Sequence, residues 1–213
     1  MKKTSVPLVI AFTPDYFIPA ATCLYSIITS MQAEGELHVI CLLSEELPER
    51  LKLKIQLIGE GRTCYSCVNL QGKLQHIYID QKYTEAASYR LLLPDLLPEY
   101  KKVIYIDCDI IVRNDLVQLY HSIDLGMNYL AAVFEASMDF QLDHLKTIGC
   151  NPNEYINSGF LIMNLELMRK DNMVEKFIEE HKEHDIKLHK TVKHGGKTNA
   201  QNEAVRLIKT ELV

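Results

Sequence analysis

Two aspartates stand two positions apart directly after an apolar run. Asp107 and Asp109 flank Cys108 and follow the segment 103–106, which reads Val-Ile-Tyr-Ile. A run of this kind predicts a buried strand, so both carboxylates are expected where that strand leaves the sheet. Two negative charges this close repel each other unless a divalent cation lies between them. Hard carboxylate oxygens suit Mg²⁺ or Mn²⁺ shared with a diphosphate, whereas a pair of solvated turn aspartates is the plainer alternative.

The elements that must position these carboxylates follow from the apolar periodicity. We expect strands at 6–12, 37–43, 63–70, 76–79, 103–106, 129–134 and 160–164. We expect helices at 16–31, 47–58, 84–93, 172–183 and 202–208. Ser44 is expected to cap the second helix, and Pro94 to end the third. This order predicts a three-layer α/β/α domain with a mostly parallel central sheet, whose ligands lie beyond the carboxyl ends of the strands.

Composition limits the classes of protein that the chain can represent. It has 213 residues, of which 47% are apolar, and this is typical of one globular domain with a substantial core. The formal net charge is -5 and the 23 Lys and Arg are spread along the chain, which argues against nucleic acid as a principal partner. The start of the chain lacks a cleavage site, and no apolar run approaches the roughly 20 residues of a membrane span. We therefore expect a cytoplasmic protein without a transmembrane segment, able at most to associate peripherally with a membrane.

The six cysteines are too few and too scattered for a disulfide scaffold. We expect most of them to be buried apolar groups in a reducing compartment. Cys64 and Cys67 have the spacing of half a zinc site or of a redox pair. No second Cys pair follows, and the segment resembles a strand, so metal or redox function is not expected there.

Five blocks of sequence occur in the order found in one enzyme family. They are Ala11 to Tyr16 followed by Ser26-Ile27, then ASYRLLLP, VIYIDCDIIV, IDLGMNYLAAV and YINSGFLIMNL. Together they resemble glycosyltransferase family 8, which includes glycogenin and bacterial galactosyltransferases and glucosyltransferases of lipopolysaccharide biosynthesis. The resemblance covers most of the chain. It implies a GT-A type nucleotide-diphospho-sugar transferase fold, with residues 1–213 as a single nucleotide-sugar-binding and catalytic domain.

The resemblance also implies an activity. It implies a retaining transferase that moves glucose or galactose from a UDP-sugar to a glycan, a lipid-linked glycan, lipopolysaccharide or a similar acceptor. Mn²⁺, or Mg²⁺, would be the cofactor, with Asp107 and Asp109 as its ligands. A cation fixed there would stabilise the negative charge that UDP gains as it leaves. The choice of sugar, the acceptor and the oligomeric state do not follow from the sequence.

Further donor-site residues are carried over from the family's motifs. Arg90 matches an arginine that faces the donor sugar and phosphates, and a planar, permanently charged guanidinium suits that task. Tyr16 matches a tyrosine that packs on the uracil ring. Thr13 stands where an Asp often contacts the base. Ala11 and Cys108 belong to the same donor-binding blocks.

Two further positions are matched near the donor sugar. Asn157 matches a family asparagine assigned to catalysis, and Gly159 would let the backbone approach the ligand closely. An ordinary Asn-Ser-Gly turn before a strand is the alternative reading of this segment. Glu135 falls where relatives carry an Asp that binds sugar hydroxyls, and it is one methylene longer.

The C-terminal part departs from the family pattern. Only Gln201, matched to an amide near the anomeric carbon, is retained of an Asp-Gln-Asp motif. Relatives continue to a His-x-x-Gly-x-x-Lys-Pro motif that supplies the third metal ligand, so we expect a C-terminally short domain. His194 to Lys197 is a partial match that we interpret as a loop.

Two alternatives stand beside the transferase. The chain could be a truncated or degenerate remnant that binds UDP and metal without transferring sugar. It could also be a haloacid-dehalogenase-like phosphatase, with Asp107 as nucleophile and Asp109 as acid. In that class the motif ends the first strand, whereas other strands are expected before Asp107 here.

Overall fold

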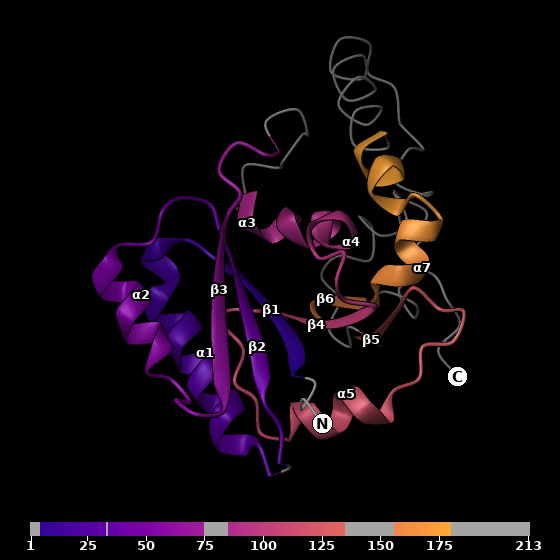
Figure 1. Ribbon diagram of the computed structural model, residues 1–213. Helices are drawn as coiled ribbons and strands as arrows, with labels where there is room; N and C mark the ends of the chain where they lie inside the picture. Colours follow the sequence, from indigo (N-terminus) through magenta and orange to yellow (C-terminus); the bar gives the residue numbers. More distant parts are fainter. Residues whose placement is uncertain (1–4, 33, 75–84, 135–155, 180–213) are drawn as a thin grey trace, which may run out of the picture.

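The computed structural model describes residues 5–32, 34–74, 85–134 and 156–179. In this part of the chain, six strands form one sheet with helices on both of its faces (Figure 1). The strands are β1 Val6–Phe12, β2 Leu37–Leu43, β3 Thr63–Asn69, β4 Lys102–Asp107, β5 Leu130–Phe134 and β6 Ile156–Asn164. The expected three-layer α/β architecture is confirmed.

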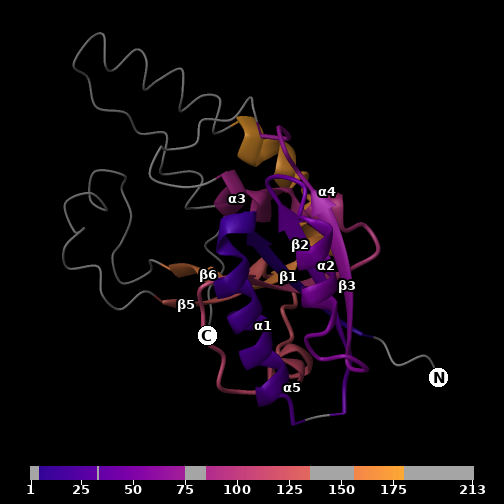
Figure 2. The same cartoon turned by 90° about the vertical axis from the view of Figure 1, so that its left-hand side faces the viewer.

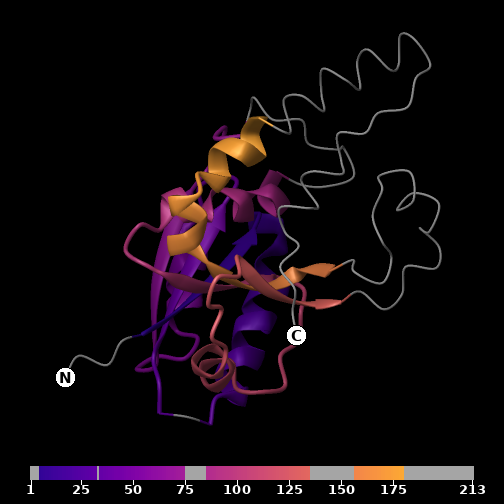
Figure 3. The same ribbon diagram turned by 90° about the vertical axis from the view of Figure 1, so that its right-hand side faces the viewer.

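The sheet has the order β3-β2-β1-β4-β6-β5. The first four strands in this order pair in parallel, as the continuous apolar runs of β1, β2 and β4 predict. β6 runs antiparallel to both of its neighbours, β4 and β5, which it pairs along most of its length (Figure 3). The sheet is therefore mostly parallel, with one antiparallel strand inserted next to the strand that carries Asp107.

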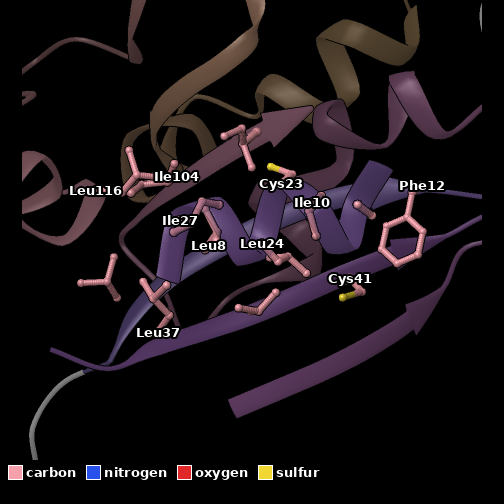
Figure 4. Packing of buried hydrophobic residues seen from close by; sticks show 14 of the residues in the cluster. Leu8, Ile10, Phe12, Cys23, Leu24, Ile27, Leu37, Cys41, Ile104 and Leu116 are labelled. Carbon is pink, nitrogen blue, oxygen red and sulfur yellow. The ribbon is translucent and has the colours of Figure 1, made fainter. Parts of the chain in front are cut away.

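Each face of the sheet has its own apolar cluster, because successive strand residues point to opposite faces. Leu8, Ile10 and Phe12 of β1 pack against α1, Phe17–Ser30, in the cluster drawn in Figure 4. That cluster also contains Ile55 of α2, Glu49–Gln56, and residues of α5, Leu116–Ser122, which lies beside the end of α1 (Figure 2). Burying one such side chain stabilises the fold by about 1.5–3 kcal/mol.

The opposite face is covered by several short helices. Val9 and Ala11 of β1 belong to a cluster with Tyr89, Leu93 and Met168. The helices are α3 Glu85–Ser88, η2 Tyr89–Leu92, α4 Leu93–Leu96 and α7 Leu165–Lys170, with a further helix at 173–179. On this last helix Met173 and Phe177 are buried as predicted, whereas Ile178 is only half-buried and Val174 is buried in addition.

Several predicted boundaries are wrong. α2 begins after Pro48, not after Ser44, because the residue before a proline is disfavoured in helical conformation. Pro94 does not end a helix but lies in the first turn of α4, where its missing N–H has no partner to lose. The segments expected at 76–79, 194–197 and 202–208, and the part of the helix expected at 172–183 that lies beyond 179, are outside the described residues.

Candidate functional site

The strand order reverses between β1 and β4. The chain passes from β1 outward to β2 and β3, and then returns to place β4 on the other side of β1. Ala11, near the end of β1, is the register partner of Asp107, the last residue of β4. Open α/β sheets usually bind their ligands beyond the carboxyl ends of the strands, at the point where the strand order reverses. Asp107 therefore lies at the carboxyl end of its strand, as predicted from the sequence.

Arg90 joins η2 to Asp107. Its Nη2 lies 3.1 Å from Oδ1 of Asp107, and its Nη1 donates to the carbonyl of Ser158 on β6. The Nε donates to the carbonyl of Ala87 at 2.7 Å. The Arg90 side chain is only 12% exposed, against 37% for Asp107. All three guanidinium nitrogens therefore bind the protein itself. The ion pair joins η2 to β4, and the hydrogen bond to Ser158 joins η2 to β6.

Tyr105 completes the environment of the Asp107 carboxylate. It lies two residues earlier on β4, so its side chain is on the same face, and its hydroxyl donates to Oδ1 of Asp107 at 2.9 Å. The Arg90 guanidinium lies over the Tyr105 ring at 4.4 Å from the centroid. Burial raises the pKa of Tyr105 well above its usual value, with a partly opposing contribution from Arg90, so the hydroxyl stays protonated and donates. This contact was not predicted from the sequence, although the position of Tyr105 two residues before an aspartate on a strand was the available signal.

β6 approaches the same carboxylate through a residue without a side chain. A β-carbon on Gly159 would lie 2.7 Å from Oδ2 of Asp107 and 3.0 Å from Oδ1 of Asn157. The Gly159 amide donates to that Asn157 oxygen at 2.8 Å. Asn157 to Gly159 belong to β6 and are not a turn before it, because the strand continues past an irregularity opposite Ala132 and Val133. The turn reading of this segment is wrong, and Asn157 and Asp107 are brought together by strand pairing.

The other two residues of the acidic motif have different surroundings. Asp109 is exposed, and Cys108 is partly buried against the cluster on the α1 face. Burial, followed by the charges of Asp109 and Asp107, raises the pKa of Cys108 to about 11. Beneath it, the buried thiol of Cys23 donates to the Asp107 carbonyl at 3.8 Å. The Cys108 thiol therefore stays protonated and faces away from the side of the sheet that carries Arg90.

Thr13 and Tyr16 lie where the chain leaves β1. Thr13 precedes the short helix η1, Pro14–Tyr16, and its carbonyl accepts a hydrogen bond from the Tyr16 amide at 2.9 Å. The Tyr16 side chain is 49% exposed. The structure therefore presents a tyrosine ring to solvent at the same strand ends as Asp107. Glu135 and Gln201 lie outside the described residues, as does His194.

The donor chemistry of the described residues fits a hard divalent cation. Asp107 and Asp109 supply carboxylate oxygens, and the protonated Cys108 between them is a poor ligand. Mg²⁺ and Mn²⁺ are commonly held by one or two carboxylates together with phosphate oxygens and water. In the described ranges no group of three or more His, Cys, Asp or Glu is placed to hold a metal. The two aspartates therefore fit a cation that is shared with a ligand.

The residues that the structure describes include no helix of the length and apolarity that crossing a bilayer requires.

Comparison with known proteins gives consistent findings. The family described as "Glycosyl transferase family 8" matches residues 7–195. General stress protein A of Bacillus subtilis is 35% identical over 117 residues, which cover 53% of this chain and 40% of that protein. Glycosyltransferase GlyE of Streptococcus pneumoniae is 29% identical over 160 residues, covering 68% of this chain and 34% of that protein. This chain thus spans less than half the length of these two curated relatives.

A solved structure with a similar fold is that of the galactosyltransferase LgtC in complex with donor and acceptor sugar analogues. It superposes with a TM-score of 0.69 at 20% sequence identity, over 95% of this chain and 70% of that chain. At this level of identity the likeness concerns the fold.

Proposed function

Because this chain belongs to glycosyltransferase family 8 and has a GT-A type fold, we propose that it is a retaining hexosyltransferase. The proposed donor is UDP-glucose or UDP-galactose, and the acceptor is a glycan, a lipid-linked glycan or lipopolysaccharide. Residues 1–213 would act as one nucleotide-sugar-binding and catalytic domain. The observation that carries this proposal is the carboxylate of Asp107, fixed by Arg90 and Tyr105 where the strand order reverses.

Asp107 and Asp109 are proposed to hold Mn²⁺ or Mg²⁺ together with the diphosphate of the donor. When bound, such a cation stabilises the negative charge that develops on the leaving UDP. Tyr105 and Arg90 both engage Oδ1 of Asp107, which keeps the carboxylate in one orientation and leaves Oδ2 facing the side of Gly159. Arg90 is therefore proposed to act first by positioning Asp107, and to reach the donor phosphates only by exchanging one of its present partners.

The remaining contacts to the UDP-sugar are proposed from where the residues lie in the fold. Tyr16, half-exposed after β1, would stack on uracil beside Thr13. Ala11 has no bulky side chain at the register position of Asp107, so a ribose or phosphate can approach the strand end. Asn157 is held next to Gly159 and would orient hydroxyls of the sugar. Sugar-binding and catalytic roles for Glu135 and Gln201 rest on the family resemblance.

The first experiment tests the metal assignment. Titration calorimetry of UDP into the full chain, with and without Mn²⁺, is expected to show binding that depends on the cation. Asp107→Asn and Asp109→Asn should each weaken this binding by at least about tenfold, which is about 1.4 kcal/mol. Asp95→Asn, at an exposed position of α4, is the matched control and should bind normally. An Asp107→Asn protein that binds Mn²⁺ and UDP like the wild type would contradict the assignment.

The second experiment tests transfer. UDP-glucose and UDP-galactose are incubated with the full chain and Mn²⁺, with and without a glycan acceptor, and released UDP and the anomeric configuration of the product are measured. Release of UDP with retention in one of the two reactions supports the transferase. Cation-dependent UDP binding without any turnover would instead support the binding remnant.

A further inference from the structure

Cys41 and Cys67 face each other across two neighbouring strands. They are register partners in the parallel pair β2–β3, and β3 is the outermost strand of the sheet that the structure describes. Cys64 also lies on β3, but it is three positions before Cys67, an odd offset, so its side chain lies on the opposite face. It pairs in register with His38. The thiols of Cys64 and Cys67 are therefore separated by the sheet, despite their C-x-x-C spacing. The register of β2 and β3 instead places Cys67 beside Cys41.

The two paired thiols differ in their surroundings. Cys41 is fully buried in the cluster on the α1 face, while Cys67 is exposed, and both are free. The Cys41 thiol hydrogen-bonds the Cys67 sulfur, and this bond, helped by the charge of Lys52, lowers the pKa of Cys67 to about 7 despite its partial burial and the opposing charges of Glu46 and Glu49. An exposed thiolate with a protonated thiol in hydrogen-bond reach is the arrangement of a reactive cysteine and its resolving partner.

Strand geometry permits a bond between them. Neighbouring strands lie about 4.8 Å apart, within the range of about 4.4–6.8 Å between the α-carbons of a disulfide. The side chains must still approach somewhat further for the bond to form. Within the described sheet β3 pairs on one side only, so it can make this adjustment more easily than a central strand.

We propose that Cys41 and Cys67 form a redox modification site that hydroperoxides convert to a cross-strand disulfide. The Cys67 thiolate attacks the terminal oxygen of the hydroperoxide, the O–O bond breaks, and an alcohol or water leaves after protonation. The Cys41 sulfur then attacks the resulting sulfenic acid at sulfur, the S–S bond forms, and water leaves. In total, two thiols and one hydroperoxide give one disulfide, one alcohol and one water.

This site is separate from the proposed donor site. β2 is separated from β4 by β1, and the pair lies on the α1 face, whereas Arg90 and Tyr105 lie on the other. Thiol reductants would restore the two cysteines, so the bond is a reversible state. The inference does not depend on transferase activity, and its test is read out without UDP or metal.

The test uses the full chain, first reduced and then treated with hydrogen peroxide. Remaining thiols are alkylated, and the digested protein is analysed by mass spectrometry without reduction. We expect a linked pair of peptides that contain Cys41 and Cys67, an intact mass lower by two hydrogens, and reversal of both by dithiothreitol. Cys67→Ser should abolish the link, whereas Cys64→Ser, on the same strand but the other face, should leave it unchanged.

A further variant tests the order of the steps. Cys41→Ala removes the resolving thiol, so Cys67 should accumulate as a sulfenic acid that dimedone labels. If this variant does not fold, the wild type and the Cys64→Ser protein still decide the question through the linked peptides. A disulfide that joins Cys64 to Cys67 in the wild type would overturn the proposal. Peroxide treatment that oxidises Cys67 beyond sulfenic acid while Cys41 stays reduced would also overturn it.

Discussion

Gly159 of β6 lies against the carboxylate of Asp107 at the end of β4. A β-carbon at position 159 would be 2.7 Å from Oδ2 of Asp107, a distance that real β-carbons essentially never show. The contact arises because Ile106 pairs with Phe160 in the antiparallel register, which places Asp107, the residue after Ile106, opposite Gly159, the residue before Phe160. Antiparallel insertion of β6 thus closes one side of the site with backbone alone.

Gly159→Ala is expected to displace the Asp107 carboxylate. The added methyl group must move Oδ2, the side-chain oxygen of Asn157, or β6 itself. Cation-dependent UDP binding should weaken by about tenfold, or about 1.4 kcal/mol, measured by calorimetry. Ser158→Ala on the same strand is the control, because only the backbone carbonyl of Ser158 contacts Arg90. Normal Mn²⁺ and UDP affinity in Gly159→Ala would show that the Asp107 orientation does not matter for binding.

Tyr105→Phe removes one of the two donors to Oδ1 of Asp107. A hydrogen bond to a charged group contributes roughly 1.5–3 kcal/mol, so Mn²⁺ affinity should fall by at least about tenfold, or about 1.4 kcal/mol, while the fold persists. Manganese binding followed by electron paramagnetic resonance measures this without UDP. Tyr120→Phe is the matched control, because it also removes a tyrosine hydroxyl, one that donates to the Lys102 carbonyl at 2.9 Å and not to Asp107. This variant should bind Mn²⁺ with the affinity of the wild type. Equal losses in both variants would indicate a general effect on the sheet.

Arg90→Lys is expected to impair the site more than the fold. A lysine cannot reproduce the fork that reaches Asp107 and Ser158 together, and it leaves a partly buried carboxylate with a weaker partner. Thermal unfolding and UDP affinity are measured on the same preparation. Arg90→Lys should lower both, with a loss of at least about tenfold in affinity.

A second arginine provides the control for that experiment. Arg169 donates to the carbonyls of Pro94, Leu97 and Tyr100, so it fastens the end of α4 without contacting the acidic motif. Arg169→Lys should lower the unfolding temperature and leave UDP affinity unchanged. If Arg169→Lys also lost UDP affinity, the effect of Arg90→Lys would reflect stability and not position.

The sequence predicts the central strands well because burial on two faces requires a continuous apolar run. β1, β2 and β4 are recognisable for this reason, and so is the position of Asp107 at a strand end. The direction and full length of β6 could not be predicted, because Asn157 to Gly159 are polar or small. Their strand conformation depends on pairing with β4 and β5.

The partners of Asp107 also differ in whether the local sequence could predict them. Tyr105 could have been found from its spacing, since residues i and i+2 of a strand share a face. The ion pair with Arg90 depends on how η2 packs over the sheet, and no local pattern encodes a contact between residues so far apart in sequence. The Cys41–Cys67 pairing likewise follows from the register of β2 and β3, whereas sequence spacing pointed to Cys64.

His38, near the start of β2, makes the stability of the fold depend on pH. Its Nδ1 is hydrogen-bonded to the Tyr100 hydroxyl at 2.5 Å and its Nε2 to the Ser66 hydroxyl at 2.7 Å. Partial burial lowers the pKa of His38, with the charge of Glu99 opposing this effect. The folded protein therefore takes up a proton at His38 less readily than the unfolded chain, whose imidazole has a pKa of about 6.5.

The stability that His38 contributes is accordingly complete above pH 6.5, the ordinary imidazole pKa, and is lost as the pH falls from there through the lower pKa of the folded state. Thermal unfolding between neutral pH and mildly acidic pH should show a decrease in unfolding temperature that is smaller in His38→Asn than in the wild type. His121→Asn, on α5, controls for the loss of an imidazole elsewhere and should follow the wild type. A His38→Asn protein with an unchanged pH dependence would contradict this origin of the acid sensitivity, because replacing the imidazole removes the only group of residue 38 that titrates in this range.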